Sequence, residues 1–469
     1  MQDAFDVVVI GGGVVGTAIA CRLSETRARV CLIEATGDVA EGASKGNAGI
    51  TSSYYAEAGT LDAKVITATY PRWEDVCARL DVPFRRIGGL ITALDDKDES
   101  MLPGELTQAL SCGVRAEIIT GSQARVLEPL ISDACQAALW LPDEGIIDPM
   151  RLTFAYAELA ALNGASIRFS APAIGFESDG DRLAAVVTPQ GTLRTRFVVN
   201  AAGLGLGLVS HLAGGEEFRM TPRKGEYWLL DREFGSQLSH IVFAAPLPDT
   251  KGIHVVPTTN GTALLGPSVE DNDRPYDKAT DEATLDYVFE RARRLVPSVS
   301  LAYAIKTFAA VRAASDERIR VRVDRRVPNL VHAANRSTGV SSSLGIADLV
   351  LELLLGAGLD TSDRSDAVRA VPPVPRLLGH PTPEQLTEVD PRYGQVVCVC
   401  EHVSAAEIAA ALEAHVPAVS IDGVRKRTGA TGGRCQGSVC MAGVAFMCSL
   451  KLGVPPQDVP VVDSGLMGA

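Results

Sequence analysis

Apolar and polar positions at the start of the chain follow a strand, turn, helix and strand pattern. Residues 6–10 read DVVVI, a continuous run rich in β-branched side chains, and residues 11–16 read GGGVVG. A helical pattern, TAIACRLSE, follows, and then a second apolar run, VCLIEA. This order is typical of the first half of a βαβ unit, so an α/β domain is predicted at the N-terminus.

The glycine-rich turn has the spacing of a dinucleotide-binding site. Gly11, Gly13 and Gly16 fit G-x-G-x-x-G, and Glu34 ends the second strand 18 residues after Gly16. The first glycine permits a tight turn, the second lets a pyrophosphate approach the backbone, and the third lets the helix pack closely on the strand. The N-terminus of the helix then faces the phosphates. Glu34 is expected to bind the ribose hydroxyls, which indicates FAD or NAD rather than NADP.

FAD is favoured over NAD by three features. The turn lies at the very start of the chain, and no second complete G-x-G-x-x-G follows it. In addition, FVVNAAGLGLG (197–207) is an apolar strand that ends in small residues, Gly203 among them, and such a strand can lie against the adenine side of a dinucleotide. Taken alone, this last segment is equally compatible with an ordinary buried strand and turn.

Further along the chain the pattern changes to shorter alternating runs. YWLLD, IHVVPT and TALLGP are compatible with strands of an antiparallel sheet. A proline-rich connector of mixed charge then occupies residues 371–394, and the composition shifts after it, which marks a domain boundary.

Composition sets limits on the class of protein. A length of 469 residues predicts about three domains. The net charge of −13 excludes nucleic acid as a partner. We expect no exported leader, because the start lacks a basic and then apolar segment. The apolar stretches are interrupted by charge, so no transmembrane segment is expected. A cytoplasmic location follows, with membrane association only through a partner.

The cysteines are unevenly distributed. Five are scattered over residues 21–135, and five lie in the last 72 residues. Four of the latter have the spacing C-x-C followed by C-x4-C; they are Cys398, Cys400, Cys435 and Cys440. Four thiolates are the ligand set of an iron-sulfur cluster. Zinc and disulfides are the alternatives, but zinc usually takes C-x2-C pairs and disulfides do not suit a cytosolic chain.

The order of motifs resembles the flavin-dependent amino-acid oxidase superfamily, in the branch that holds glycerol-3-phosphate and L-2-hydroxyglutarate dehydrogenases. The resemblance covers most of residues 5–360. It rests on VVIGGGVVGTAIACRL, EGASKGNAGI, RRIGGLITA, DEGIIDPMRL, VVNAAGLG, PRKGEYWLLD, HVVPTTNGTALLGP, FAAVRAASDERI and NRSTGVSSSLGIADLV. The C-terminal segments CVCEHVSAAEI and TGATGGRCQGSVC resemble the 2Fe-2S domain of bacterioferritin-associated ferredoxin, which is also appended to the anaerobic glycerol-3-phosphate dehydrogenase large subunit.

These resemblances imply a Rossmann-like FAD-binding domain, an inserted α+β substrate domain with an antiparallel sheet, and a small helical 2Fe-2S domain. The FAD-binding domain is expected to be discontinuous, over residues 1–90, 145–212 and 300–368. The substrate domain then takes residues 91–144 and 213–299, the linker 369–394, and the 2Fe-2S domain 395–469.

The resemblance also implies roles for individual residues. Ser44, Lys45 and Asn47 are expected beside the flavin pyrophosphate and ring. Arg312 occupies the position of an arginine that binds a substrate carboxylate or phosphate, although the proline that usually follows is Ala313 here. Arg336 is expected as a second anion clamp or flavin contact. For each arginine, a surface ion pair is the alternative. The same turn as Arg336 contributes Gly339 and Val340 to the cofactor site.

The sequence departs from the family at the catalytic base. The hydroxy-acid and glycerol-phosphate enzymes carry a histidine a few residues after the position of Asn47, whereas this chain reads ITSSYY over residues 50–55. An alcohol benefits from a positioned base during hydride loss and a neutral amine does not, so this absence favours amine oxidation. The GNAG segment likewise resembles D-amino-acid dehydrogenases. His254 is the alternative base, unless it is an ordinary core histidine.

A flavin takes a hydride and a 2Fe-2S centre passes single electrons, so the pair implies a dehydrogenase that exports electrons to a partner subunit or quinone. The leading interpretation is a dehydrogenase of a small anionic hydroxy compound. The alternatives are an amino-acid or imino-acid dehydrogenase and a non-catalytic electron-transfer subunit. A basic run in the last domain either offsets cluster charge, docks an acidic partner or is a solvated face; it comprises Arg425, Lys426, Arg427 and Arg434.

Overall fold

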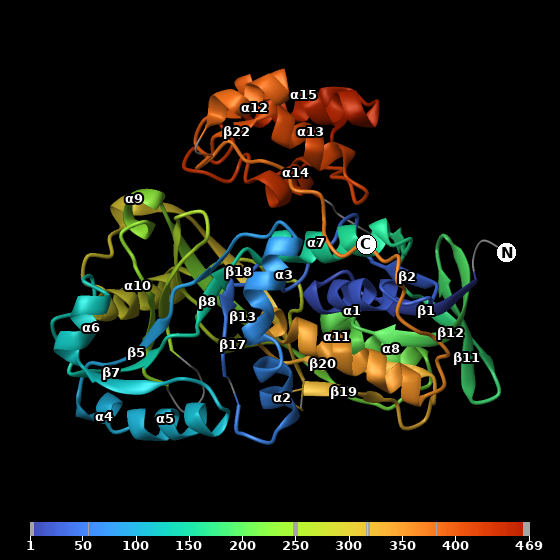
Figure 1. Ribbon diagram of the computed structural model, residues 1–469, viewed down its shortest axis with the longest axis horizontal. Coiled ribbons are helices and arrows are strands. Elements are labelled where there is room, and N and C mark those ends of the chain that lie inside the picture. Colours follow the sequence, from blue (N-terminus) through green and yellow to red (C-terminus); the bar gives the residue numbers. More distant parts are fainter. Residues whose placement is uncertain are drawn as a thin grey trace.

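The structure is a computed structural model that describes residues 4–54, 56–246, 252–315, 317, 319–380 and 382–462. Two large sheets form the body of the molecule, and a small helical module made by the C-terminal residues sits on one side of it (Figure 1). The predicted fold class is confirmed: a Rossmann-like α/β part, a part built on a mainly antiparallel sheet, and a small helical C-terminal part.

The first sheet has five parallel strands in the order β9-β2-β1-β12-β20. Their bounds are β1 (Ala4–Ile10), β2 (Val30–Ile33), β9 (Ser166–Arg168), β12 (Gly191–Asn200) and β20 (Leu330–Asn335). Three further strands join it in antiparallel fashion; they are β10 (Gly175–Asp179), β11 (Arg182–Thr188) and β19 (Ile319–Val323). The helices against it are α1 (Val14–Ser24), α7 (Pro149–Leu162) and α11 (Gly339–Gly356).

Side chains of β1 enter two different cores because successive residues of a strand point to opposite faces. Val7 and Val9 pack in the core shared with α1, α7 and α11. Val8 and Ile10 pack on the other face, in the core formed with β10 and β11. All four are buried. The continuous apolar run of the sequence therefore corresponds to a central strand covered on both sides.

The second sheet has nine strands and lies beside the first. Along most of its length the order is β17-β13-β16-β15-β14-β5-β7-β6, with β18 on the other side of β13. The strand bounds are β5 (Gly89–Ala93), β6 (Glu117–Thr120), β7 (Ala137–Leu141), β13 (Met220–Leu230), β14 (Ile241–Ala244), β15 (His254–Pro257), β16 (Ala263–Gly266), β17 (Glu270–Asp271) and β18 (Ala304–Ser315). Only the β5–β14 pair is parallel. The runs YWLLD, IHVVPT and TALLGP correspond to β13, β15 and β16.

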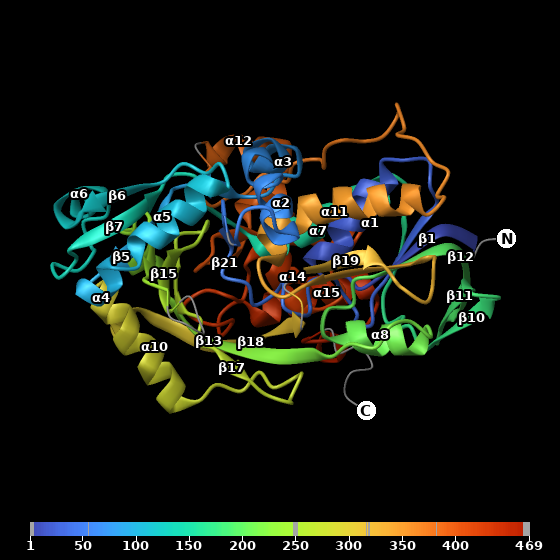
Figure 2. The ribbon, with the colours of Figure 1, turned by 90° about the horizontal axis from the view of Figure 1, so that it is seen from below.

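One expected boundary differs from the structure. The sequence predicts that residues 300–315 belong to the FAD-binding domain. In the structure, β18 pairs with β13 over its whole length, from Met220↔Ser315 to Leu230↔Ala304. The second sheet therefore extends to residue 315. Figure 2 shows these two long strands running along one side of the molecule toward the first sheet. They form one wall of the space between the two sheets.

The remaining elements of the body pack on both sheets and at the junction. A small sheet consists of β3 (Ile50–Thr51), β4 (Phe84–Arg86) and β8 (Gly145–Ile147). The other helices of four or more residues are α2 (Leu61–Thr67), α3 (Trp73–Arg79), α4 (Asp96–Glu99), α5 (Leu102–Ser111), α6 (Gly121–Leu127), α8 (Leu206–Leu212), α9 (Arg232–Gly235) and α10 (Glu282–Leu295). Within the described residues, α11 is the one helix long and apolar enough to cross a bilayer, and 61 % of its apolar window is buried in the protein core.

The C-terminal module, residues 395–462 as described, has a small core of its own. Its elements are β21 (Val396–Cys398), β22 (Val403–Ser404), α13 (Ala405–Glu413), α14 (Ile421–Thr428) and α15 (Met441–Leu452), and α12 (Pro383–Val389) in the connector packs beside them. A capping box opens α13: the Glu407 N–H donates to the Ser404 hydroxyl at 3.3 Å, and the Ser404 N–H donates to the Glu407 carboxylate at 2.9 Å. Helix α14 faces the body and lies against α7 (Figure 1).

Candidate flavin, substrate and cluster sites

A single cavity of about 2020 Å³ lies between the two sheets and beneath the C-terminal module. The glycine-rich turn, the loop after Glu34 and the start of α11 line one part of it. Strands β13, β15, β16 and β18 line another part, and Glu401 and Gly432 of the module complete its edge. We call this space the central cavity. All the residues that the sequence assigned to the flavin and the substrate, apart from Gly16, line it.

The glycine-rich turn is built for close backbone approach. Gly11 has φ +112°, and a Cβ there would lie 2.5 Å from the Ala201 carbonyl oxygen. A Cβ on Gly16 would overlap the carbonyl oxygen of Gly11, so the helix can lie against the strand only with glycine at this position. Gly13 precedes α1 and has no side chain to cap it. The N-terminus of α1 therefore opens toward the cavity as an anion-binding end.

Glu34 lies at the cavity where the second strand ends. One of its carboxylate oxygens accepts the Gly12 N–H at 2.6 Å, and the other accepts the Thr36 N–H and hydroxyl, each at 2.8 Å. These bonds hold the carboxylate beside the glycine-rich turn, in the position where a ribose would meet it.

The loop after Glu34 contributes three predicted residues with different contacts. The Ser44 hydroxyl accepts the Val14 N–H at 2.9 Å and so joins the loop to the first turn of α1. Asn47 Oδ1 accepts the Gly49 N–H at 2.7 Å. Lys45 lines the cavity, but its ammonium forms ion pairs with Glu41, at 3.2 Å, and with Asp422 of the C-terminal module. Lys45 therefore also takes part in the contact between body and module.

The far side of the cofactor region is formed by two turns. Gly203 follows β12 with φ +58°, and Gly339 and Val340 are the first residues of α11. All three line the central cavity. The residues present fit FAD: a helix N-terminus for the pyrophosphate, a carboxylate for the ribose, and glycines where a Cβ would obstruct the backbone.

An aromatic row crosses the second sheet and faces the cavity. Tyr227 and Phe308 are paired residues on β13 and β18, and their rings stack at 4.9 Å with an interplanar angle of 9°. Across the next strands, His254 pairs with Gly266 and with Phe243, and its ring meets Phe243 edge-on at 5.0 Å. Because paired residues share a face of the sheet, these rings form a common wall of the cavity. His254 is 8 % exposed and is the one cavity-lining histidine in the described part of the chain.

A group of arginines lies further along the same two strands. Arg312 on β18 is paired with Arg223 on β13, which in turn is paired with Asp271 on β17. The Arg223 guanidinium donates two hydrogen bonds to the Asp271 carboxylate, at 2.5 and 2.6 Å. The pKa of Asp271 is lowered first by this hydrogen bond and also by the charges of Arg336 and Arg312. These three arginines and Asp271 therefore share one region of the cavity, and we call them the arginine cluster.

Arg312 is a member of the cluster that is available to a ligand. Its Nε and Nη2 are buried and make no hydrogen bond to any residue that the structure describes. The Tyr227 phenol lies within its electrostatic reach, since the Arg312 charge opposes the rise that burial causes in the Tyr227 pKa. A buried guanidinium without partners carries a desolvation cost that a bound anion would remove. The alternative, a surface ion pair, is not seen at Arg312 among the described residues.

Among the described residues of the segment after Asn47, none supplies a base to the cavity. The Ser52 N–H donates to the Ser341 hydroxyl at 2.9 Å, and the Ser53 hydroxyl donates to Glu144 at 2.6 Å. The Tyr54 hydroxyl donates to Glu105 at 2.7 Å, and burial followed by the Glu105 charge raises the pKa of Tyr54. These hydroxyls and carboxylates are tied to one another, so the family's histidine has no substitute at this place.

The four predicted cluster ligands come together in the C-terminal module. The Cys400 thiol lies against that of Cys435, and the Cys440 thiol lies against that of Cys398. Hydrogen bonding from the Val439 N–H and from the Cys400 thiol lowers the pKa of Cys435 to about 7, whereas burial and then Cys398 raise that of Cys440 to about 11. Cys448 is fully buried in the module core. Two adjacent thiol pairs fit a centre in which each of two irons takes two cysteines.

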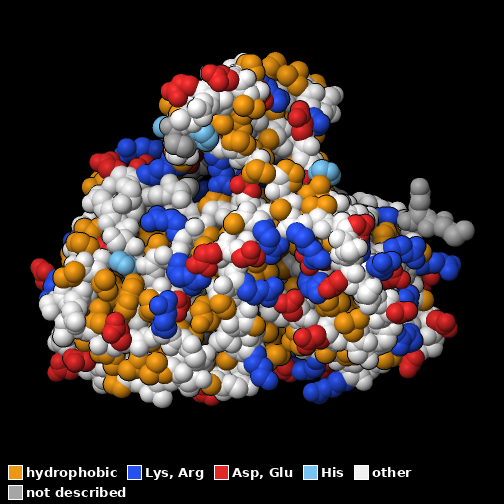
Figure 3. All heavy atoms as spheres, viewed as in Figure 1, with side chains coloured by type: hydrophobic (Ala, Val, Ile, Leu, Met, Phe, Trp, Pro, Cys, Tyr) orange, Lys and Arg blue, Asp and Glu red, His pale blue; other side chains and the backbone are white. Residues whose placement is uncertain are grey.

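The basic run of the module meets an acidic patch on the body. The Arg427 guanidinium donates two bonds to the Asp38 carboxylate, at 2.7 and 2.9 Å, and it lies 3.8 Å over the ring of Phe154. Lys426 is 3.0 Å from Asp38 and also pairs with Glu41. Lys and Arg side chains gather around the hollow below the module (Figure 3). Of the readings left open from sequence, these contacts favour docking, with the acidic partner in the same chain.

Asp38→Asn is expected to weaken the docking of the module by about 3 kcal/mol, because it leaves two buried cations with a neutral partner. Asp38 is fully buried. The measurement is the urea midpoint at which the visible absorbance of the cluster is lost. Asp75→Asn is the matched control, since Asp75 is 75 % exposed and pairs only with Arg79; it is expected to change the midpoint by less than the equivalent of about 0.5 kcal/mol. Equal effects of the two variants would contradict the prediction.

The same carboxylate gives a pH dependence. Burial opposes its ionisation, but Arg427 and Lys426 outweigh burial and lower the pKa of Asp38 below its ordinary value. A lowered carboxyl pKa contributes stability that is complete above the unfolded value of about 3.9 and is lost as pH falls through the folded value. The urea midpoint of the wild type is therefore expected to fall below about pH 4 more steeply than that of Asp38→Asn.

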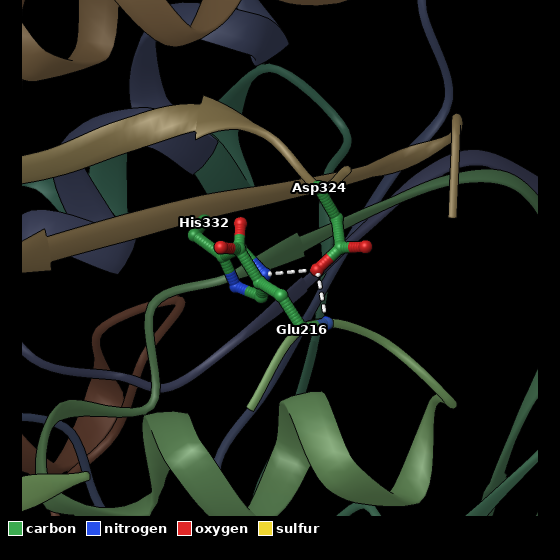
Figure 4. A group of neighbouring side chains, drawn as sticks. All are labelled: Glu216, Asp324 and His332. Atoms are coloured by element: carbon green, nitrogen blue, oxygen red, sulfur yellow. Dashed lines mark hydrogen bonds and ion pairs between the residues drawn. The ribbon is translucent and has the colours of Figure 1, made fainter. Parts of the chain in front are cut away.

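A third group of charged side chains lies apart from the cavity wall, at β19, β20 and the segment before β13 (Figure 4). Glu216, Asp324 and His332 bring their ligand atoms within 4.8 Å of one another. However, the Asp324 carboxylate already accepts bonds from His332 Nε2 and the Glu216 N–H, each at 2.8 Å, and Glu216 pairs with Arg320 and Arg322 at 3.1 and 2.8 Å. With its anionic groups neutralised by arginines, this cluster is a structural ion network.

Sequence reasoning missed two sets of residues. Arg223 and Asp271 complete the arginine cluster, and Asp38 and Glu41 receive the module. The contacts that these residues make join distant segments of the chain. Arg223 and Asp271 are 48 residues apart, and Asp38 is 389 residues from its partner Arg427. The one available signal was the basic run, which indicated an acidic surface without locating it.

Comparison with known proteins agrees with these sites. The sequence profile of the FAD-dependent oxidoreductase family DAO matches residues 6–353, and that of the BFD-like 2Fe-2S binding domain matches residues 396–445. A glycerol 3-phosphate dehydrogenase of Caloramator mitchellensis is 33 % identical, covering 97 % of this chain and 96 % of its own. An anaerobic glycerol-3-phosphate dehydrogenase subunit A1 of Haloferax volcanii is 28 % identical, over 94 % of this chain and 82 % of its own.

Among solved structures, the L-α-glycerophosphate oxidase of Mycoplasma pneumoniae, with FAD bound, superposes with a TM-score of 0.74 at 22 % identity, covering 79 % of this chain and 99 % of its own. An L-proline dehydrogenase of P. horikoshii gives 0.69 at 22 % identity, over 76 % and 94 %. These likenesses show the fold. The protein belongs to the DAO family of FAD-dependent oxidoreductases, with FAD as its cofactor, and carries a BFD-like 2Fe-2S domain at its C-terminus.

Proposed function

We propose that this protein is a dehydrogenase of a small anionic alcohol, glycerol 3-phosphate first among the candidates, that delivers electrons through its 2Fe-2S cluster to a partner subunit or quinone. The observation that carries the proposal is the Arg312 guanidinium, whose buried Nε and Nη2 lie at the cavity without a hydrogen-bonding partner among the described residues. Full-length similarity to a glycerol 3-phosphate dehydrogenase supports the choice of substrate.

The charge of the arginine cluster suits a small anion. Arg223, Arg312 and Arg336 bring three positive charges, of which Asp271 balances one. A guanidinium binds the oxygens of phosphate or carboxylate in a bidentate manner. The site therefore accommodates a phosphate ester, and a 2-hydroxy acid is the second member of the same substrate class.

The residues of the cavity have distinct tasks in alcohol oxidation. When bound, FAD accepts the hydride from the carbinol carbon. Arg312 holds the anionic end of the substrate, and the stacked Tyr227 and Phe308 rings exclude water from that side. A ring nitrogen of His254 takes the hydroxyl proton, a role suited to an imidazole near neutral pH.

A second candidate, oxidation of an amino or imino acid, is favoured by one observation. The hydroxyls of Ser53 and Tyr54 donate to Glu144 and Glu105, so no described residue of this segment replaces the histidine that the family resemblance leads us to expect. An amine needs no such base, because its lone pair is already available. The carboxylate of an amino acid would bind Arg312 as a phosphate would.

Anaerobic reduction of the flavin separates these candidates. Bleaching of the flavin band is to be followed after mixing with glycerol 3-phosphate, L-2-hydroxyglutarate, D-amino acids or hydroxyproline. We expect glycerol 3-phosphate to bleach the flavin. Bleaching by amines alone would make the second candidate correct, and bleaching by a reduced partner flavoprotein alone would identify a non-catalytic electron-transfer subunit.

The proposal includes the setting in which the protein works. Relatives named as subunits of anaerobic glycerol-3-phosphate dehydrogenase support a partner subunit as electron acceptor. We place the protein in the cytoplasm, with any contact to the membrane made by that partner.

A further inference from the structure

Several contacts join the C-terminal module to the body, and two of them lie close to the central cavity. The first is the contact of Arg427 and Lys426 with Asp38 described above. The second is made by Arg232 of α9, which forms bonds to Cys400 and Glu401. Between the two attachments, Glu401, Gly429 and Gly432 of the module line the central cavity. The loops that hold the cluster ligands therefore form part of the cavity wall.

Arg232 makes three contacts with its one guanidinium. Nη1 donates to the carbonyl oxygen of Cys400 at 3.0 Å, and Nη2 pairs with the carboxylate of Glu401. Nε donates to the carbonyl oxygen of Asn260 at 2.7 Å, in the turn between β15 and β16 that also lines the cavity. One planar group thus joins the wall of the substrate side to the backbone of a cluster ligand.

The loop that carries Cys400 lies in close contact with the loop that carries Cys435. A Cβ on Gly433 would lie 2.8 Å from the Cβ of Cys400 and would overlap the Glu401 carboxylate, so the two ligand loops meet only because residue 433 is glycine. Movement of the Cys400 segment would carry the Cys435 loop with it. A fork of charge-assisted bonds fixes direction as well as distance. Arg232 is therefore placed to set the orientation of both loops toward the cavity.

We propose that Arg232 is a positioning residue that holds the Cys400 loop over the central cavity, so that electrons pass from the flavin to the cluster within one chain. The inference rests on the proposed function. Substrate oxidation transfers a hydride, which carries two electrons and one proton, to the flavin, and the hydroxyl proton leaves to the solvent through the base. The oxidised cluster accepts one of the two electrons from the flavin. The second electron stays on the flavin until a one-electron acceptor outside the chain, such as ferricyanide, reoxidises the cluster.

The test is rapid anaerobic mixing of Arg232→Ala holoenzyme with glycerol 3-phosphate. Bleaching of the flavin should remain within twofold of the wild type, because Arg232 does not line the cavity. Appearance of the reduced cluster, followed by its electron paramagnetic resonance signal, should slow at least tenfold. Arg232→Lys should recover part of the rate, since it restores the charge without the fork. Arg293→Ala is the control and should change neither rate; among the described residues, this exposed arginine pairs with Glu290 and lies over the Phe289 ring.

Three further measurements separate positioning from other roles. The midpoint potential of the cluster and the iron content should be unchanged in Arg232→Ala, and amide hydrogen exchange should rise in residues 399–403. The flavin is also to be reduced by light, without substrate, so that the electron-transfer step is tested even if glycerol 3-phosphate fails to bleach the flavin and the proposed function is wrong. Unaltered cluster reduction in Arg232→Ala by either route, or a changed cluster potential that accounts for the slower rate, would overturn the inference.

Discussion

Arg312→Met is expected to lower kcat/KM for glycerol 3-phosphate by roughly 10²–10³-fold. The substitution removes a charge-assisted, bidentate contact in a buried site, for which losses of about 2–5 kcal/mol are typical, and each 1.4 kcal/mol corresponds to about tenfold. The structure supports the upper part of this range, because the guanidinium nitrogens Nε and Nη2 are buried and have no other hydrogen-bonding partner among the described residues. Anaerobic flavin bleaching at varied substrate concentration provides the measurement.

Two variants make this result specific. Arg312→Lys keeps the charge but loses the fork, so its activity should lie between those of the wild type and Arg312→Met. Arg294→Met changes an exposed arginine whose nearest carboxylate, that of Asp95, is 3.9 Å away, and it should leave kcat/KM unaltered. FAD content should be the same in all three. A loss of less than threefold in Arg312→Met would show that the anion binds elsewhere.

Cys435→Ser should abolish the visible absorbance of the cluster while FAD remains bound. A serine hydroxyl is a poor substitute for a thiolate at iron, and hydrogen bonds from the Val439 N–H and the Cys400 thiol lower the pKa of Cys435 to about 7. Because the flavin site is formed by other segments, the substrate should still bleach the flavin. Steady-state transfer to an external one-electron acceptor should fall at least tenfold.

The matched control is Cys112→Ser. Cys112 is partly exposed, lies outside the module, and donates a hydrogen bond to the Ala56 carbonyl oxygen at 3.3 Å. It should retain full cluster absorbance, with about two irons and negligible zinc per chain by metal analysis. Zinc in the wild-type protein, or cluster absorbance that survives in Cys435→Ser, would refute the assignment of the ligands.

Features encoded in short segments could be predicted from the sequence. Gly11, Gly13 and Gly16 reveal their role by spacing, because the turn that they form is local. The same holds for the C-x-C and C-x4-C pairs and for the Ser404 capping box. In the glycine-rich turn and the capping box, the neighbours along the chain are also the neighbours in space. The cysteines reveal their role by number and spacing, although each thiol contacts one from the other pair.

Contacts between distant segments could not be predicted in this way. Pairing of β18 with β13 joins strands separated by about seventy residues, and neither run shows which sheet it enters. Lys45 matches the family's loop, yet its ammonium is drawn to Asp422 in another part of the chain. The missing histidine was visible in the sequence, but the carboxylates that engage Ser53 and Tyr54 were not.

The attachment of the C-terminal module to the body has a consequence for how electrons are delivered in a cell. Because flavin and cluster reside on one polypeptide, their ratio is fixed at one to one, whatever the level of expression. A tethered carrier also has an effective concentration that does not fall on dilution. The rate of internal transfer should therefore be independent of enzyme concentration, and only the step to the external acceptor should follow second-order kinetics.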